Sequence, residues 1–186
     1  MASASPRRAE LLARFGLTFE IWPAHIDERL LPQETPQAHV ARLAAEKAAR
    51  AHTEFPGHVV LAGDTVVVLD NQVMGKPQSL SHARDMLLRL SGRAHSVLTG
   101  YHLLDGPSGQ TLTGVVETQV VFRPLSPAML DWYLATGEPM DKAGAYGIQE
   151  LGGLLVERMA GSFNNVVGFP VEEILWRMLQ QGWLTW

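Results

Sequence analysis

Hydrophobic positions recur with the period of a helix in several stretches of the chain. Leu11, Leu12 and Phe15 form one apolar stripe, which Ser5-Pro6 can open and Gly16 can end. Similar stripes predict further helices over 36–51, 81–90, 127–136 and 170–181.

Apolar runs of strand length lie between these helices. They predict strands at 19–23, 59–69, 73–74, 95–104, 115–123 and 154–158, with turns at 70–72 and 106–109. Because helices and hairpin strands mix without strict alternation, the order predicts an α/β (mixed α+β) fold, in which flanking helices cover a twisted mixed sheet.

The length and composition suit one globular domain over residues 1–186, built as two small lobes around a cleft. The 186 residues are 46% hydrophobic and 18% charged, so a sizeable core can form. The net charge of −4 argues against nucleic acid as a partner. No apolar run is long enough to span a bilayer, so we expect no membrane partner either.

The first residues and the cysteine count bear on the compartment. Residues 1–8 contain no hydrophobic stretch of the signal-peptide type. The chain has no cysteine, which excludes disulfides and thiolate catalysis. Both observations fit a cytoplasmic protein.

The N-terminal run Ser3-Ala4-Ser5-Pro6-Arg7-Arg8 opens the first predicted helix. Free N–H groups and the helix dipole favour anions at this place, and arginine offers forked donors to phosphate oxygens. The alternative is an ordinary capped helix with two solvated arginines. Arginine in a first helical turn opposes the dipole, however, which favours an anionic ligand.

Two acidic segments are candidates for catalysis or metal binding. Asp64 interrupts the apolar run 59–69, and a carboxylate in a buried strand needs a cation beside it. It is either a general base or metal ligand, or a strand end that faces water. Ile26-Asp27-Glu28 follows a predicted strand, and Glu28 together with Asp64 can hold Mg²⁺ if substrate phosphates complete the coordination.

Lysine is rare in this chain, with Lys47, Lys76 and Lys142 against twelve arginines. Each lies beside glycine, proline or acidic residues, which weakly indicates that a compact charge is needed there. The last begins the segment 142–149, whose glycines allow close approach to a flat ligand. The carboxamide of Gln149 can pair with the N3–H and a carbonyl of uracil or thymine; the alternative is a structural turn.

Several common catalytic patterns are missing from the sequence. The seven histidines form no HxxxH or HxH pair, and neither a GxSxG elbow, a GxxxxGK[ST] loop nor a GxGxxG loop is present. Trp176, Trp183 and Trp186 are more typical of core or interface positions than of a stacking platform.

Together these segments resemble the Maf family over nearly the whole chain. Nine motifs follow its pattern in order: Ser3-Ala4-Ser5-Pro6-Arg7-Arg8, Ile26-Asp27-Glu28, Glu46-Lys47-Ala48, Gly63-Asp64-Thr65-Val66-Val67, Gly75-Lys76-Pro77, Leu90-Ser91-Gly92-Arg93, Gly137-Glu138-Pro139, Lys142-Ala143-Gly144-Ala145-Tyr146-Gly147-Ile148-Gln149 and Val166-Val167-Gly168-Phe169-Pro170. Nine motifs in register are far more specific than any one of them.

The resemblance implies a fold like that of the inosine triphosphate pyrophosphatases, often dimeric, so a homodimer is expected. It also implies hydrolysis of a nucleoside triphosphate to its monophosphate and pyrophosphate, with a divalent cation (Mg²⁺ or Mn²⁺) as cofactor. By motif, Asp64 is the general base, and Asp64 and Glu28 bind metal. The same mapping assigns base choice to Arg8, Thr65 and Gln149, and phosphate binding to Ser3, Arg7, Lys47 and Lys76.

Two positions point to one branch of the family. Ala145-Tyr146-Gly147-Ile148-Gln149 resembles the branch that acts on dTTP and UTP. The branch that acts on 7-methyl-GTP typically reads Ser-Phe in this loop and has Gln in place of Thr65. The expected role is therefore housecleaning of non-canonical or modified pyrimidine nucleotides.

The chain departs from the family pattern at two places. Members usually carry an apolar strand before the serine motif, whereas Met1 directly precedes Ala2-Ser3 here. Either the start of the chain is placed late or the strand is absent, and its absence would leave Ser3 and Arg7 less firmly anchored. Glu150 replaces the glycine that commonly follows the glutamine, which adds a charge beside the expected base pocket. A rival interpretation is a nucleotide-binding regulator of cell division (a septum formation inhibitor) without essential catalysis.

Overall fold

The computed structural model describes residues 1–185. Its α-helices are α1 (Pro6–Ala13), α2 (Pro36–Glu54), α3 (Leu80–Leu90), α4 (Pro127–Ala135), α5 (Phe163–Val167) and α6 (Val171–Gln180). Three short 3₁₀ turns interrupt the loop after α4: η1 (Glu138–Asp141), η2 (Ala143–Ala145) and η3 (Leu151–Leu155). The strands are β1 (Val59–Leu69), β2 (Gln72–Met74), β3 (Ala94–Asp105), β4 (Thr111–Phe122) and β5 (Val156–Ala160).

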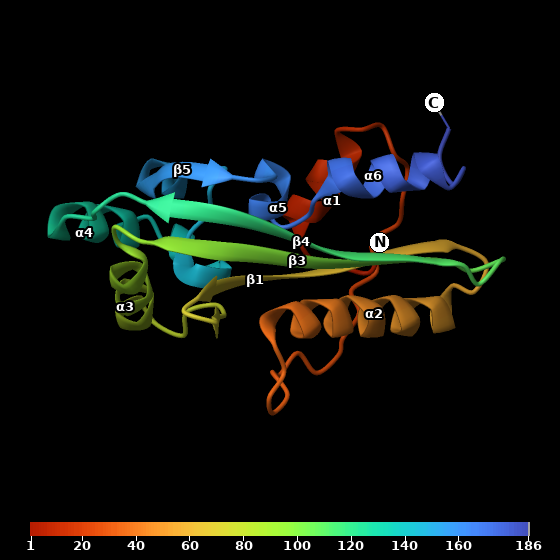
Figure 1. Cartoon of the computed structure of the whole chain (residues 1–186), viewed down its shortest axis with the longest axis horizontal. Helices are drawn as coiled ribbons and strands as arrows, with labels where there is room; N and C mark the ends of the chain where they lie inside the picture. Colours follow the sequence, from red (N-terminus) through yellow and green to blue (C-terminus); the bar gives the residue numbers. More distant parts are fainter. Residues whose placement is uncertain (186) are drawn as a thin grey trace. The chain divides into compact units, whose positions relative to one another are not determined.

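The strands form one five-stranded sheet in the order β2-β1-β3-β4-β5 (Figure 1). β1 and β2 pair antiparallel through a tight turn in which Asp70 and Asn71 both have positive φ, as this hairpin type requires. β4 and β5 also pair antiparallel. Ala2 adds an isolated parallel bridge to Ala62. The predicted α/β class, with a twisted sheet and flanking helices, is confirmed.

The chain divides into two compact units. The first contains Met1–Thr65, Thr99–Val116 and Gly168–Trp186, and the second contains Val66–Leu98 and Glu117–Val167. Both units therefore include parts of the long strands β1, β3 and β4, and each is described here by itself.

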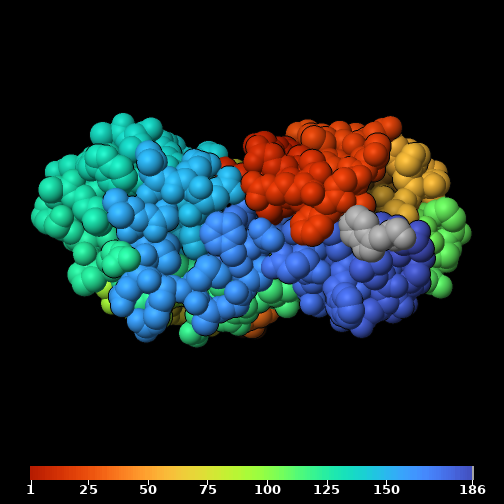
Figure 2. All heavy atoms as spheres, turned by 90° about the horizontal axis from the view of Figure 1, so that it is seen from above, coloured from red at the N-terminus to blue at the C-terminus, as the bar shows by residue number. Residues whose placement is uncertain are grey.

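In the first unit, helices cover both faces of the strands. Figure 1 shows α2 on one face and α1 and α6 on the other. The helix α2 lies so close to β3 that a Cβ at Gly100 would stand 2.3 Å from the backbone oxygen of Val40. In Figure 2 the N-terminal residues, drawn in red, lie beside the blue C-terminal helix.

In the second unit, α3 and α4 pack with the sheet around an apolar core. Its largest fully buried side chains include Tyr133, Phe122, Leu87 and Leu90. Tyr146, from the loop before η3, is part of the same core. The loop that contains Tyr146 is thus held by its own buried residues, Ala145 and Tyr146.

The structure differs from the predicted elements at one strand, one helix cap and one short helix. Residues 19–23 are not a strand. Their backbone instead contacts Met1, whose amino group donates to the Glu20 carbonyl at 2.6 Å and whose carbonyl accepts from the N–H of Trp22 at 2.9 Å. Ser5 lies at the N-cap of α1 but makes no side-chain cap hydrogen bond. The five-residue helix α5 was not predicted, since it is too short to show a period.

The structure narrows the expectation for the tryptophans. Trp176 is 60% exposed, so of the two expected positions, core or interface, it does not occupy the core, whereas Trp183 is half-buried. Trp186 lies outside the described residues. Within residues 1–185 no helix combines the length and the apolar character needed to cross a membrane.

Candidate functional site

Arg8 is the centre of a buried network in the first unit. Its Nε donates to the carbonyl of Gly168 at 2.8 Å, and its Nη1 donates to the carbonyl of Gly63 at 2.7 Å. Its Nη2 donates to the hydroxyl of Thr65 at 3.0 Å, and Ser3 Oγ accepts from Nη1 at 3.3 Å. The network brings together three residues that the sequence predicted for the site: Ser3, Arg8 and Thr65.

The electrostatics of Arg8 follow from this burial. Burial lowers the pKa of its guanidinium from the ordinary value, and the carboxylates of Asp64 and Glu28 oppose that shift. The arginine therefore interacts electrostatically with both acidic residues of the predicted metal site. Arg7, on the first turn of α1, is half-buried.

Thr65 is fixed by the same network. Its hydroxyl lies 2.8 Å from that of Thr99 and donates to the carbonyl of Gly168 at 3.0 Å. Thr65 and Arg8 therefore bind each other and share the carbonyl of Gly168 as an acceptor.

The start of the chain is anchored to β1. The N–H of Ala2 donates to the carbonyl of Leu61 at 2.8 Å, and the Ala2 side chain is buried. Ser3 follows directly and accepts a hydrogen bond from the N–H of Ser5 at 3.1 Å. The expectation that Ser3 would be poorly anchored is therefore wrong, because a backbone pairing to β1 holds the residue before it.

A lysine joins the two predicted acidic residues. Lys47 Nζ lies 2.6 Å from Asp64 Oδ1 and 2.6 Å from Glu28 Oε1. The side chains of Lys47 and Asp64 are only 8% and 12% exposed, whereas that of Glu28 is 57% exposed. Asp64 is thus a buried, paired carboxylate, and the alternative of a strand end that faces water is excluded.

The donor set suits a divalent cation that also binds substrate. The described residues contain no cluster of three or more His, Cys, Asp or Glu side chains. Asp64 and Glu28 nevertheless offer two carboxylates in contact with one ammonium group, so their oxygens lie close together. One or two carboxylates plus phosphate oxygens is the usual coordination of Mg²⁺, and these residues fit it.

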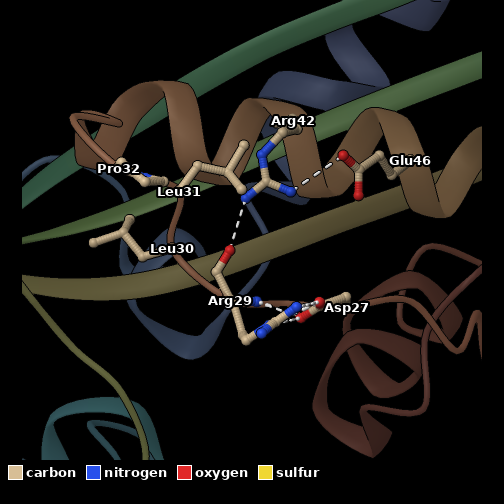
Figure 3. Close-up of a pocket in the computed structure, with 7 residues that line it drawn as sticks. All are labelled: Asp27, Arg29, Leu30, Leu31, Pro32, Arg42 and Glu46. Carbon is tan, nitrogen blue, oxygen red and sulfur yellow. Dashed lines mark hydrogen bonds and ion pairs between the residues drawn. The ribbon is translucent and has the colours of Figure 1, made fainter.

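The loop that presents Glu28 is fastened to α2 by Arg42, as Figure 3 shows. Arg42 Nη2 donates to the carbonyl of Arg29 at 3.0 Å, and its Nη1 donates to Glu46 at 3.1 Å. Beneath the loop, Glu34 accepts from Arg42 Nε at 2.6 Å and from the N–H of Leu31 at 3.1 Å. The loop and α2 line a cavity of about 460 Å³ whose walls are Asp27, Arg29, Leu30, Leu31, Pro32, Arg42 and Glu46.

The remaining predicted residues belong to the second unit. Lys76 is exposed after β2 and forms no ion pair within the described chain. Gln149 is exposed as well, and its carboxamide makes no hydrogen bond to another described residue. Lys142 is instead buried, and its Nζ contacts the Glu138 carbonyl at 3.0 Å and Asp141 at 2.8 Å, so it has a structural role.

The profile of the family described as Maf-like protein matches residues 1–181. The chain belongs to the Maf family. Among its relatives, a protein named dTTP/UTP pyrophosphatase from Anaeromyxobacter dehalogenans (strain 2CP-1 / ATCC BAA-258) is 53% identical over 175 residues, which cover 93% of this chain and 88% of the relative.

Two further relatives carry the same name. The one from Syntrophus aciditrophicus (strain SB) is 44% identical over 185 residues, covering 100% of this chain and 90% of the relative. The one from Pyrococcus abyssi (strain GE5 / Orsay) is 45% identical over 175 residues, which cover 94% of this chain and 91% of the relative.

Two buried residues of this Maf chain were missed by the sequence reasoning. The Nδ2 of Asn165, a fully buried residue, donates to the Val97 carbonyl and to Thr118 Oγ1, both at 3.0 Å. His95 lies 2.8 Å from the Tyr146 hydroxyl, and burial lowers its pKa to about 4, so it is neutral near neutral pH. No local pattern marks either residue, because their partners lie far away in the sequence.

The Glu34 contact predicts how stability depends on pH. The hydrogen bond from Arg42 is the main cause that lowers the pKa of Glu34 from 4.5 to about 2. A depressed pKa stabilises the fold above 4.5, and this contribution disappears as the pH falls to about 2. We expect Glu34→Gln to unfold at lower urea than wild type near neutral pH, with a difference that shrinks through this range.

The measurement is the urea midpoint of both proteins across that pH range. Glu10→Gln, which changes an exposed carboxylate on α1, serves as the control and should track wild type. A difference between Glu34→Gln and wild type that stays constant down to about pH 2 contradicts the linkage.

Proposed function

We propose that this Maf protein is a nucleoside triphosphate pyrophosphatase that hydrolyses dTTP and UTP to the monophosphate and pyrophosphate. The observation that carries the proposal is the buried Asp64 carboxylate, paired with Lys47 and joined through it to Glu28. Relatives at 44–53% identity, named dTTP/UTP pyrophosphatase, support the same reaction.

In the proposed mechanism Asp64 is the general base. Its carboxylate orients a water molecule and takes its proton as the water oxygen bonds to the α-phosphorus. The bond from that phosphorus to the bridging oxygen breaks, and pyrophosphate leaves with the electron pair. Lys47 holds the Asp64 carboxylate in place, because its ammonium donates to Oδ1 at 2.6 Å.

A divalent cation, Mg²⁺ or Mn²⁺, completes the proposed chemistry. Asp64 and Glu28 would hold it, and when bound it neutralises phosphate charge and favours ionisation of water. Arg42 binds the Arg29 carbonyl and Glu34, and so fixes the loop that carries Glu28. We propose that these contacts help to place Glu28 at the cation site.

Binding of the triphosphate is assigned to cationic and hydroxyl groups. We propose that Arg7, Lys47 and Lys76 offset the charge that builds on the leaving pyrophosphate, with Ser3 as a further donor. Arg8 and Thr65 are proposed to affect base choice by fixing the backbone at Gly168, since both bind its carbonyl.

The test is pyrophosphate release from dTTP, UTP, CTP, dATP, GTP and 7-methyl-GTP with Mg²⁺ or Mn²⁺. We expect dTTP and UTP to be turned over rapidly and the other four, including CTP, only slowly, with complete loss of turnover after chelation of the metal by EDTA. Nucleotide binding without turnover of any of the six would refute the proposal and favour the cell-division regulator, which the names of the relatives do not favour.

Gln149 is proposed to recognise the uracil or thymine edge. Its exposed carboxamide can accept from N3–H and donate to a neighbouring carbonyl. We expect Gln149→Ala to lower kcat/KM for UTP by about tenfold to a hundredfold, mainly through KM, because a site built to hydrogen-bond a substrate discriminates strongly. The control is Gln181→Ala, at an exposed glutamine after α6. Equal losses in the two variants would contradict the assignment.

The cellular setting follows the same reasoning. We propose that the enzyme works in the cytoplasm and removes modified or non-canonical pyrimidine nucleotides from the pool. The homodimer expected from the family resemblance stays a prediction, as do the absence of a nucleic-acid partner and of a membrane partner.

A further inference from the structure

Glu138 is half-buried within the second unit, and both of its carboxylate oxygens accept hydrogen bonds. Oε1 accepts from the Tyr133 hydroxyl at 2.8 Å and from the N–H of Gly152 at 3.0 Å. Oε2 accepts from the N–H of Leu151 at 3.0 Å. The carboxylate therefore holds the backbone directly after Gln149 and Glu150.

Tyr133 extends this contact to the other side of Gln149. Its hydroxyl accepts from the N–H of Gly147 at 3.2 Å while it donates to Glu138. Burial raises the pKa of Tyr133 above its ordinary value, so the hydroxyl keeps its proton for this donation. Together Glu138 and Tyr133 fix the segment 147–152 at both ends, with Gln149 between.

The close packing around this segment supports a defined conformation. A Cβ at Gly152 would stand 2.6 Å from the Tyr133 hydroxyl oxygen, and one at Gly147 would stand 2.5 Å from Lys142 Cε. Ala145, just before the segment, has φ 61°, a strained conformation that persists only where the surroundings enforce it. The backbone is thus closely packed at both ends of the segment, on either side of the exposed Gln149.

We propose that Glu138, acting with Tyr133, is the positioning residue that aims the Gln149 carboxamide at the pyrimidine edge. The inference rests on the proposed function, since it assigns base recognition to Gln149. Glu138 does not touch substrate in this proposal. It acts by binding backbone N–H groups, and without these hydrogen bonds the segment could move. A displacement of a binding group by about 1 Å can lower the rate about a hundredfold.

Glu138→Gln tests the proposal with minimal change in shape. A carboxamide has one acceptor oxygen, so in either orientation its NH₂ group faces an N–H or O–H donor that the carboxylate bound. Tyr133→Phe breaks the link to Gly147 while it leaves the carboxylate intact. Glu157→Gln, at an exposed carboxylate on β5, is the matched control.

The decisive readout is the ratio of kcat/KM for UTP to kcat/KM for CTP. These substrates share sugar and triphosphate and differ at the edge that Gln149 would read. A loss of folded protein lowers both constants equally and leaves their ratio unchanged. We expect Glu138→Gln and Tyr133→Phe to lower the ratio at least about tenfold, chiefly through KM for UTP, while Glu157→Gln leaves it unchanged.

Amide hydrogen exchange gives a second readout that does not depend on turnover. We expect faster exchange at residues 147, 151 and 152 in Glu138→Gln, with the core strands β3 and β4 as protected as in wild type. In one outcome the wild type prefers UTP to CTP while both variants keep its ratio of kcat/KM values and its exchange rates. That outcome would overturn the positioning role of Glu138 but not the proposed function. A wild type that hydrolyses neither substrate would refute the proposed function, and exchange alone would then decide whether Glu138 holds the segment.

Discussion

Asp64→Asn is expected to lower kcat/KM for UTP by about a thousandfold while the protein stays folded. The reason is that a general base typically contributes about a hundredfold to ten-thousandfold to the rate. Asparagine has nearly the same shape and its oxygen can still accept from Lys47, which now lies 2.6 Å from Oδ1. What it lacks is the negative charge that takes a proton from water and binds a cation. The measurement is pyrophosphate release, with thermal unfolding measured in parallel.

The matched control for this variant is Asp85→Asn, which removes an exposed carboxylate from α3. It changes the net charge by the same amount and should leave kcat/KM unchanged. Near-normal turnover by Asp64→Asn would contradict the general-base assignment and leave Asp64 as the structural partner of Lys47.

Lys47→Met is expected to lower the free energy of unfolding by about 3 kcal/mol, because it leaves a buried carboxylate without its cation. Methionine fills much of the space of the lysine stem, so little packing is lost. The cost arises at Asp64, whose side chain is only 12% exposed, and less at Glu28, which water can solvate. The measurement is urea unfolding near neutral pH.

A double variant separates charge from packing. In Lys47→Met with Asp64→Asn the carboxylate that the first substitution leaves without its ammonium is itself replaced by a neutral group, so we expect at least half of the lost stability to return. Arg158→Met, which breaks an exposed pair with Glu157, is the control and should change stability by less than about 1 kcal/mol. Equal losses in the single and double variants would show that packing, and not the ion pair, explains the effect.

Some site residues were predictable because their signals are local. Asp64 stands out as a carboxylate in an apolar run, and the structure buries it and pairs it with a cation. Lys47 stands out because lysine is rare here. A short window of sequence contains the first signal, since burial follows from the apolar neighbours of a strand residue, and the composition of the chain contains the second.

Other residues gave a local signal that did not reveal their partners. The run 3–8 suggested an anion site at a helix start, and within it Arg8 is buried and donates to Gly63, Thr65 and Gly168. Lys142 belongs to a motif segment, but its ammonium binds Glu138 and Asp141. A charged side chain reaches whatever acceptor the fold brings near, and neighbours in sequence do not reveal that acceptor.

The sequence by itself determined the helices, the hairpins and the family, because periodicity, turn residues and ordered motifs all act over short distances along the chain. Only the tertiary structure decided how the site is built. Arg8 meets the Gly168 carbonyl across 160 residues, and Asn165 meets Val97 across 68. The Gly137-Glu138-Pro139 motif was visible in the sequence, but its role depends on Tyr133 and on the backbone of 151–152, which folding alone brings together.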